Sequence, residues 1–147
     1  MTPFVRVLNA DQLRAAAIPE PWAFGMADRV RFGELDALNH VNNVQYLRWY
    51  ETLRVHYLEH LRLYELAGPD PKFVIKTVTV DYNAEVMRGA TYINTTRTVA
   101  MRSSSFTMEY ATFVDGAVTT TGSAVVVLLD KTNTKRTLPD ALRAALI

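Results

Sequence analysis

Apolar and aromatic residues recur at spacings of three and four between positions 46 and 64, which predicts the buried face of a helix. The residues of this face are Tyr46, Tyr50, Leu53, Tyr57, Leu61 and Tyr64. Asn42 or Asn43 supplies an N-cap, and Gly68 followed by Pro69 is a strong stop signal. The pattern therefore predicts one helix of about 23 residues, roughly 35 Å long.

An alternation with a period of two predicts strands before and after this helix. The first strand is expected over residues 23–33, and four longer ones follow at Phe73–Tyr82, Ala90–Met101, Ser104–Val114 and Val118–Leu129. Asp115-Gly116, between the last two, is a hairpin signal. One helix cannot cover both faces of such a sheet. We therefore predict an α+β fold in which a twisted antiparallel sheet wraps around the helix and leaves its far face for a partner subunit.

The two ends of the chain are predicted to be accessory. Residues 1–22 form an N-terminal arm, with a short strand at Val5–Leu8 and a helical turn capped by Asp11. Residues 23–147 form a single domain that ends in a short helix over Asp140–Ile147.

The composition limits the classes of function. The 147 residues carry a formal net charge of +1, with 16 basic and 15 acidic side chains, so no general positive field is available to hold a nucleic acid. The absence of cysteine excludes disulfides, thiolate metal sites and cysteine nucleophiles. No apolar run is long enough for a signal peptide or a membrane span. We expect a cytoplasmic protein that binds neither nucleic acid nor membrane.

The densest cluster of chemically capable residues lies just before the helix, at positions 31–43. Asp36 and His40 are four residues apart, and the helix N-terminus that follows offers unpaired N–H groups and a positive dipole. Such N–H groups can hold the oxyanion that develops when a carbonyl is attacked, and a nearby carboxylate can activate water or attack directly. The alternative is that Asp36 and the asparagines form turns and caps, with His40 as a structural hydrogen bonder.

The run RFGELDALNHVNNVQYLRWYETLR, residues 31–54, resembles the signature of hotdog-fold acyl-CoA thioesterases of the 4-hydroxybenzoyl-CoA thioesterase type. The matching positions are Phe32, Asp36, His40-Val41-Asn42-Asn43, Tyr46, Glu51 and Arg54. The resemblance implies a hotdog fold, with a long central helix wrapped by a five- to six-stranded antiparallel sheet. It implies a homodimer or a homotetramer made of two dimers, with active sites at subunit interfaces.

The resemblance also implies roles for single residues. Asp36 falls at the position of the catalytic aspartate of the family, and His40 matches its histidine. The expected substrate-binding residues are Val41, Asn42, Asn43, Tyr46, Glu51 and Ser104. For Glu51, an ion pair with Arg48 or Arg54 is an equal alternative, and for Ser104 the alternative is an ordinary turn. Five basic residues are candidates for the phosphates of coenzyme A: Arg88, Arg102, Lys131, Lys135 and Arg136.

Two positions depart from the family pattern. Asn39 stands where the family often has glycine, and asparagine tolerates a positive φ better than most residues. Leu38 stands where the related acyl-carrier-protein thioesterases have a catalytic asparagine, and leucine cannot orient water. Acyl-CoA is therefore the expected substrate.

The sequence thus predicts an acyl-CoA thioester hydrolase that needs no cofactor. Asp36 is expected to act as general base or nucleophile, and the first amides of the helix are expected to form the oxyanion hole. A hotdog dehydratase or hydratase and a non-catalytic acyl-binding protein are the alternatives. His56 and His60 have a spacing that can bind zinc, but no third ligand follows in a recognised pattern, so we expect no metal.

Overall fold

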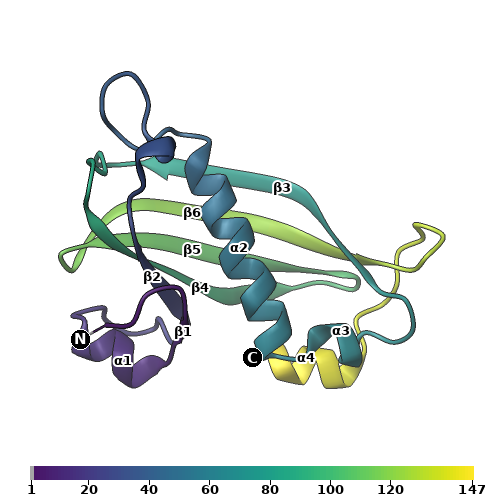
Figure 1. The fold of residues 1–147 in the computed structure, drawn as a ribbon. Coiled ribbons are helices and arrows are strands. Elements are labelled where there is room, and N and C mark those ends of the chain that lie inside the picture. The colour runs from purple at the N-terminus through teal and green to yellow at the C-terminus, as the bar shows by residue number, and fades with distance from the viewer. Residues whose placement is uncertain (1) are drawn as a thin grey trace.

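The sheet has six strands, all antiparallel, in the order β1-β2-β4-β5-β6-β3 (Figure 1). A computed structural model describes residues 2–147. The strands are β1 (Val7–Leu8), β2 (Gly25–Arg29), β3 (Lys72–Tyr82), β4 (Thr91–Met101), β5 (Ser105–Val114) and β6 (Ala117–Leu129). The helices are α1 (Ala10–Ala15), α2 (Gln45–His60), α3 (Leu63–Leu66) and α4 (Asp140–Leu146), with a 3₁₀ turn, η1, at Phe32–Glu34. The predicted α+β fold, a sheet around one long helix, is confirmed.

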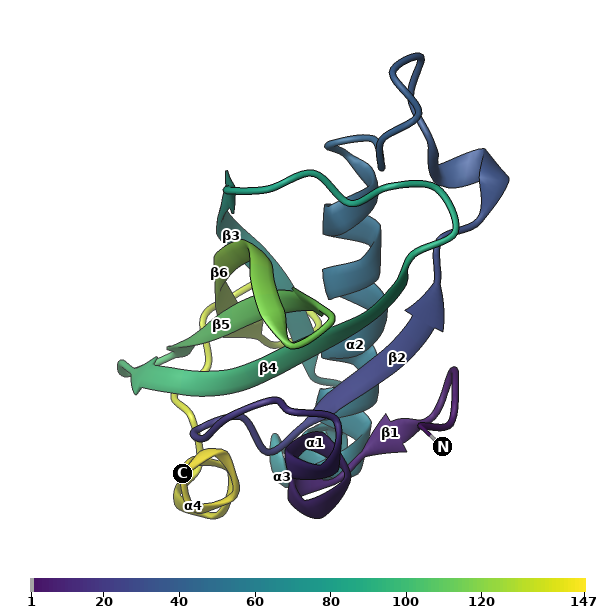
Figure 2. The same cartoon turned by 90° about the vertical axis from the view of Figure 1, so that its left-hand side faces the viewer.

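The α2 helix lies in the concave face of the curved sheet (Figure 2). Its apolar face follows the predicted spacing, and Tyr46, Trp49, Tyr50, Leu53 and Tyr57 are all buried. The strands bring alternate side chains to the same core, which includes Phe106, Met108, Tyr110, Val126 and Leu128. Tyr50 and Tyr110 stack with ring centroids 4.7 Å apart, so the helix is fixed by aromatic packing as well as by burial.

The predicted 23-residue helix is too long. The α2 helix has 16 residues and ends at His60, because Arg62 adopts a left-handed conformation with φ of 59°. The chain then turns into the short α3 before Gly68. The turn buries Leu63, which would point away from the core if the helix continued straight. The predicted cap is also wrong, since Val44 is the N-cap residue and no side chain caps the helix there.

The predicted strand at residues 23–33 is too long as well. The β2 strand ends at Arg29, and the chain then forms the η1 turn. The carboxylate of Glu34 accepts a hydrogen bond from the Arg31 N–H at 2.7 Å, which stabilises this turn rather than an extended chain. As a result the segment that carries Asp36 leaves the sheet and turns back towards α2.

The N-terminal segment, expected as an arm, packs against the outer face of the sheet. Its buried residues Leu8, Leu13, Ile18 and Trp22 form a second core with side chains of β2, β4 and β5. Asn9 caps α1 through a reciprocal bond pair with Gln12, so the predicted cap at Asp11 is wrong. One end of the outer face is thus covered within the chain, and only the rest is open to a partner.

The β3 strand forms one edge of the sheet. It pairs with β6 from Lys72 to Tyr82, and in residues 2–147 no strand pairs with its other side. Val74, Ile75 and Val78 on this strand are exposed large apolar residues. A long apolar edge of this kind is prone to pair with another strand.

No helix formed by residues 2–147 is both long enough and apolar enough to span a membrane. The cytoplasmic location expected from the sequence stays a prediction.

Candidate functional site

The loop before α2 is shaped by Asp36. The Oδ1 atom of Asp36 accepts hydrogen bonds from the N–H groups of Leu38, at 2.8 Å, and His40, at 3.2 Å. The Asp36 N–H donates to the carbonyl of His40 at 2.8 Å. Asn39 lies in this turn with φ of 66°. A positive φ is expected here, because the family often has glycine at this position. Asp36 therefore does form a turn, as the alternative prediction for this residue states. The turn occupies only one of its two carboxylate oxygens.

Five of the predicted site residues line one hollow of about 420 Å³. They are Asp36, His40, Val41, Asn43 and Tyr46, and they face the end of β3 and the loop that follows it. The hollow is open to solvent, and Asp36 is exposed. Its remaining carboxylate oxygen is accordingly free to meet a water molecule or a substrate. Asn42 lies in the same loop, where its side-chain oxygen accepts the Val44 N–H at 3.1 Å.

Most of the amides that were expected to form an oxyanion hole already have acceptors. The N–H groups of Val41, Asn42 and Gln45 donate to backbone carbonyls at 2.8 to 2.9 Å. The Asn43 N–H has no hydrogen-bond acceptor within residues 2–147. Of the predicted group of amides, the Asn43 N–H therefore remains as a candidate donor beside the hollow, just before the start of α2.

The end of β3 supplies residues that the sequence did not reveal. The Tyr82 hydroxyl donates to the carbonyl of Asn43 at 2.7 Å, and Glu85 places a carboxylate oxygen 3.1 Å from Nε2 of His40. Tyr82 could have been found by counting the two-residue alternation of β3 from Val80, which faces the core. Glu85 follows the strand in a loop, and no spacing in the sequence indicates it.

Burial of the aromatic side of the hollow changes its acid–base properties. Tyr46 is almost fully buried and packs edge-on against Tyr82, with ring centroids 5.3 Å apart. Burial raises the pKa of Tyr46, and burial also raises the pKa of Tyr82. Both phenols stay neutral at ordinary pH, so they can donate hydrogen bonds but do not act as bases.

Two predicted site residues lie elsewhere in the single chain. Glu51 is exposed on α2 and lines a smaller hollow, of about 200 Å³, with Phe73 and Ile75 of β3. It forms no ion pair with any residue from 2 to 147, so the alternative of a pair with Arg48 or Arg54 is wrong, and substrate binding by Glu51 stays a prediction. Ser104 lies before β5, on the opposite face of the sheet from α2.

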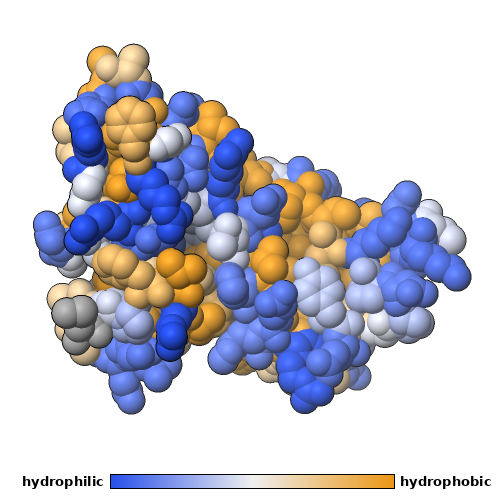
Figure 3. Space-filling model, viewed as in Figure 1, coloured by the Kyte–Doolittle hydropathy of each residue, from blue (hydrophilic) through white to orange (hydrophobic). Residues whose placement is uncertain are grey.

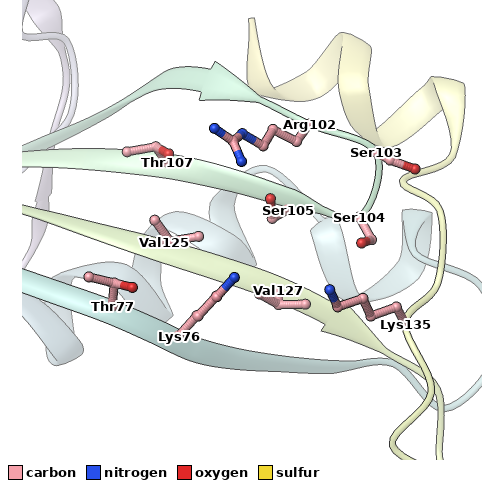
Figure 4. Close-up of a pocket in the computed structure, with 10 residues that line it drawn as sticks. All are labelled: Lys76, Thr77, Arg102, Ser103, Ser104, Ser105, Thr107, Val125, Val127 and Lys135. Carbon is pink, nitrogen blue, oxygen red and sulfur yellow. The ribbon is translucent and has the colours of Figure 1, made fainter.

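Ser104 belongs to a second hollow, of about 380 Å³, which we call the basic hollow (Figure 4). Lys76, Arg102 and Lys135 line it together with the hydroxyls of Thr77, Ser103, Ser104, Ser105 and Thr107. No carboxylate lines the basic hollow, and its three cations form no ion pair in the described chain. Its lining has the charge and the hydroxyl donors that suit an anion.

The other basic candidates have different partners. Arg136 donates to the carbonyls of Ala67 and Pro69, and the Arg88 guanidinium lies 5.6 Å from the ring centroid of Phe32. Lys131 is exposed, outside the basic hollow. Of the five basic candidates, only Arg102 and Lys135 line the basic hollow. Lys76 also lines it, although the sequence did not indicate this residue.

No group of three or more His, Cys, Asp or Glu side chains in residues 2–147 is placed to hold a metal ion. His60 instead packs beside Phe24, with ring centroids 5.3 Å apart.

Comparison with known proteins places the chain in a family. The profile of the thioesterase-like superfamily matches residues 30–146, which include the Asp36 loop and the whole of the sheet from β3 to β6. The chain belongs to the thioesterase-like superfamily. None of the curated proteins matches it significantly.

Solved structures agree with this assignment. A thioesterase-superfamily protein from Jannaschia sp. CCS1 is 44% identical and superposes with a TM-score of 0.90, over 99% of this chain and 94% of that one. A thioesterase from Thermus thermophilus, solved with coenzyme A and zinc, is 30% identical with a TM-score of 0.76, over 87% and 95% of the two chains. A 1,4-dihydroxy-2-naphthoyl-CoA thioesterase from Synechocystis, 13% identical, shares the fold with a TM-score of 0.71, over 83% and 93%. The predicted family and the hotdog fold are confirmed, and the protein is a thioesterase.

Proposed function

We propose that this thioesterase hydrolyses acyl-CoA to free coenzyme A and a carboxylic acid, with Asp36 as the reacting carboxylate. The observation that carries the proposal is that the free oxygen of Asp36 and the unpaired N–H of Asn43 border the same open hollow. One group can drive attack on a carbonyl, and the other can bind the oxygen that becomes negative. Coenzyme A bound to the Thermus relative supports the choice of thioester.

The reaction follows from this arrangement. The thioester oxygen accepts a hydrogen bond from the Asn43 N–H at the positive end of α2. Asp36 removes a proton from a water molecule, whose oxygen forms a bond to the carbonyl carbon. The carbon–sulfur bond then breaks, and the coenzyme A thiolate takes up the proton. Direct attack by Asp36, through an anhydride that water then opens, gives the same products.

His40 and Glu85 support the departing thiolate. Their side chains are 3.1 Å apart at the border of the hollow, so the Glu85 carboxylate fixes the orientation of the imidazole. An imidazole N–H beside the sulfur can donate a hydrogen bond to the negative charge that forms when the carbon–sulfur bond breaks.

The proposal includes a homodimer that forms through β3. The edge strand carries the exposed apolar residues Val74, Ile75 and Val78, and α2 adds Leu47 and Val55. Figure 3 shows apolar patches among polar side chains on the face of the molecule where α2 lies in Figure 1. Antiparallel pairing of two β3 strands satisfies their free N–H and C=O groups. It also places the Tyr82 end of one strand beside the Phe73 end of the other. Asp36 of one subunit then approaches the Glu51 surface of its partner, which explains why these residues lie apart in one chain.

The basic hollow is our candidate for the phosphates of coenzyme A. The basic hollow includes Val127 of β6, which pairs with Val74 in the first half of β3, so the same pairing brings the basic hollow of one subunit towards the Asp36 end of the other. The extended thiol arm of coenzyme A would connect the two. Charge-assisted hydrogen bonds from Arg102, Lys76 and Lys135 would fix the phosphates.

A panel of thioesters with thiol detection tests the proposed reaction. We expect thiol release from saturated aliphatic or aromatic acyl-CoA, at a rate above that of the buffer alone. Addition of water to an enoyl-CoA without thiol release would instead show a hydratase. Binding of acyl-CoA without thiol release over hours would show an acyl-binding protein. Either of these two results contradicts the proposal.

Sedimentation velocity tests the dimer. The chain mass is 16.6 kDa, and we expect the parent protein to sediment at about twice this mass. Val78→Pro removes an N–H and the regular geometry from the exposed edge of β3, and it should yield monomers. Val118→Pro, at an exposed position on β6 away from the edge, is the comparison for general loss of stability. A parent protein that sediments as a monomer contradicts the dimer.

A further inference from the structure

Glu34 carries a buried carboxylate that the proposed reaction does not use. The residue is 8% exposed, and it forms no ion pair with a basic side chain in the described part of the chain. A buried carboxylate is costly unless hydrogen bonds satisfy it. Three N–H donors do so here, and each belongs to a part of the chain that borders the Asp36 loop.

The two carboxylate oxygens of Glu34 bind different elements. Oε1 accepts the Arg31 N–H of the η1 turn at 2.7 Å. Oε2 accepts the indole N–H of Trp49 at 2.7 Å and the side-chain amide of Gln45 at 3.1 Å. Gln45 and Trp49 are four residues apart on one face of α2. The carboxylate therefore joins the turn that precedes the loop to the first two turns of the helix.

The backbone of Glu34 holds the other end of the loop. Its carbonyl accepts the Asn42 N–H at 2.8 Å, next to the unpaired amide of Asn43. Between these two anchors, Leu35 pairs with Val41 as an isolated bridge, and Asp36 begins its own turn. Glu34 thus connects the Asp36 loop to α2 through its side chain and to the start of the helix through its carbonyl.

The helix side of this connection is rigid. The Trp49 ring stacks on Tyr92 of β4 with ring centroids 4.0 Å apart, and it packs edge-on against Tyr46. Trp49 is itself 7% exposed. A loop fixed to Trp49 is therefore fixed to the core of the sheet.

We infer that Glu34 is a positioning residue, whose buried carboxylate holds Asp36 and the Asn43 amide at their separation across the hollow. The role rests on the proposed function, because it concerns the geometry of that reaction. Glu34 does not line the hollow and does not touch the substrate position, so it is not itself a catalytic residue. A carboxylate is suited to this role because it only accepts hydrogen bonds, and all three of its partners are donors.

Glu34→Gln tests the inference by replacing one acceptor oxygen with a donor of the same size. The new NH₂ group must face either the Arg31 N–H or the donors of α2. Since a displacement of about 1 Å can cost roughly 100-fold in rate, we expect kcat to fall between about 10-fold and 100-fold, with KM within about 2-fold of the parent. Glu59→Gln, on an exposed part of α2, should keep the parent values. A Glu34→Gln protein with the parent kcat overturns the inference.

NMR spectra of a ¹⁵N-labelled sample test the inference without an activity assay, because they resolve the indole N–H signals of the tryptophans. The chain has two tryptophans, Trp22 and Trp49, so Trp22→Phe assigns the Trp49 signal. In Glu34→Gln we expect the Trp49 signal to move and the Asn42 amide to exchange faster with solvent, while Trp22 stays unchanged. An unmoved Trp49 signal and unchanged exchange at Asn42 overturn the inference even if the parent protein proves to have no thioesterase activity.

A second variant keeps the test valid if Glu34→Gln does not fold. Trp49→Phe leaves the carboxylate in place and removes one of its three donors. We expect a smaller fall in kcat than for Glu34→Gln, with KM again close to the parent value. A parent kcat in a folded Trp49→Phe protein contradicts the inference. Absence of activity in the parent, by contrast, would contradict the proposed function. The NMR spectra alone would then test whether Glu34 positions the loop.

Discussion

The Tyr82 hydroxyl donates a 2.7 Å hydrogen bond to the carbonyl of Asn43, and it thereby ties the end of the edge strand β3 to the start of α2. Asn43 is thus held through its carbonyl, while its N–H has no acceptor in residues 2–147 and the residue lines the hollow. If the strand edge moved, this amide would move with it.

Tyr82→Phe should therefore affect activity more than stability. The change removes one hydrogen bond, worth about 0.5–1.5 kcal/mol, and keeps the ring contact with Tyr46. We expect a fall in kcat with a small loss of unfolding free energy, measured by thiol release and by urea denaturation. Tyr64→Phe, on an exposed ring outside the hollow, serves as the control. Equal kinetics for the two variants would show that the Tyr82–Asn43 bond does not position the amide.

Asn39 gives a test of the backbone of the Asp36 turn. Its φ of 66° is acceptable for asparagine and glycine and is strongly unfavourable for a β-branched residue. Asn39→Gly should keep the parent kcat. Asn39→Val should lower kcat, because the turn that holds the Leu38 and His40 amides on Asp36 cannot form without strain. Similar activity in the two variants would contradict a role for this turn.

The sequence predicted the local parts of the site and not their assembly. Asp36, His40 and Asn43 were found because a short motif and a helix start lie together in the chain, and the positive φ of Asn39 followed from its replacement of glycine. Tyr82 and Glu85 were missed because they approach the loop from β3 through tertiary structure. Glu51 and Ser104 lie in other hollows of the single chain. A one-dimensional pattern holds no information on contacts between strand ends or between subunits.

The length of α2 was overestimated for a related reason. The apolar spacing runs without interruption from Tyr46 to Tyr64, and no glycine or proline precedes Gly68. The helix nevertheless ends at His60, because Arg62 adopts the left-handed conformation that turns Leu63 into the core. The free energy gained by burying Leu63 thus outweighs the steric cost of the left-handed conformation at Arg62.

Arg62→Gly should stabilise the protein. Glycine adopts the observed φ of 59° without the steric cost that arginine meets, and it is the residue preferred where helices end in this way. The change also removes the exposed ion pair with Glu65, which contributes little in water. We expect a rise in Tm of a few degrees in calorimetry, with unchanged thiol release. A lower Tm would show that the ion pair matters more than the backbone conformation.

The buried tyrosines predict a loss of stability in alkali. Burial raises the pKa of Tyr50, Tyr57, Tyr92 and Tyr110 above the value of about 10 that an exposed tyrosine has. Because the folded pKa lies above the unfolded one, this contribution to stability is complete below about pH 10 and is lost as the pH rises through the folded values. Urea denaturation from about pH 8 to pH 11 should show a falling unfolding free energy at the alkaline end.

Tyr50→Phe separates this effect from general alkaline damage. Tyr50 is almost fully buried, and its hydroxyl bonds Thr112 at 2.8 Å. The variant should be less stable than the parent at neutral pH, because Thr112 loses a partner, and it should lose less stability on going to alkali. A slope with pH equal to that of the parent would contradict the assignment to Tyr50.

The role of Asp36 is tested by the rate of thiol release from the Asp36→Asn protein. Asparagine keeps the shape of the side chain and an oxygen for the Leu38 and His40 amides, so the loop should persist, while the carboxylate chemistry is lost. With an acyl-CoA that the parent hydrolyses, we expect kcat to fall by at least about 100-fold, with an unchanged far-UV circular dichroism spectrum. Asp11→Asn, at an exposed carboxylate on α1, should match the parent. Thiol release by Asp36→Asn at the parent rate would contradict the assignment of Asp36 as the reacting carboxylate.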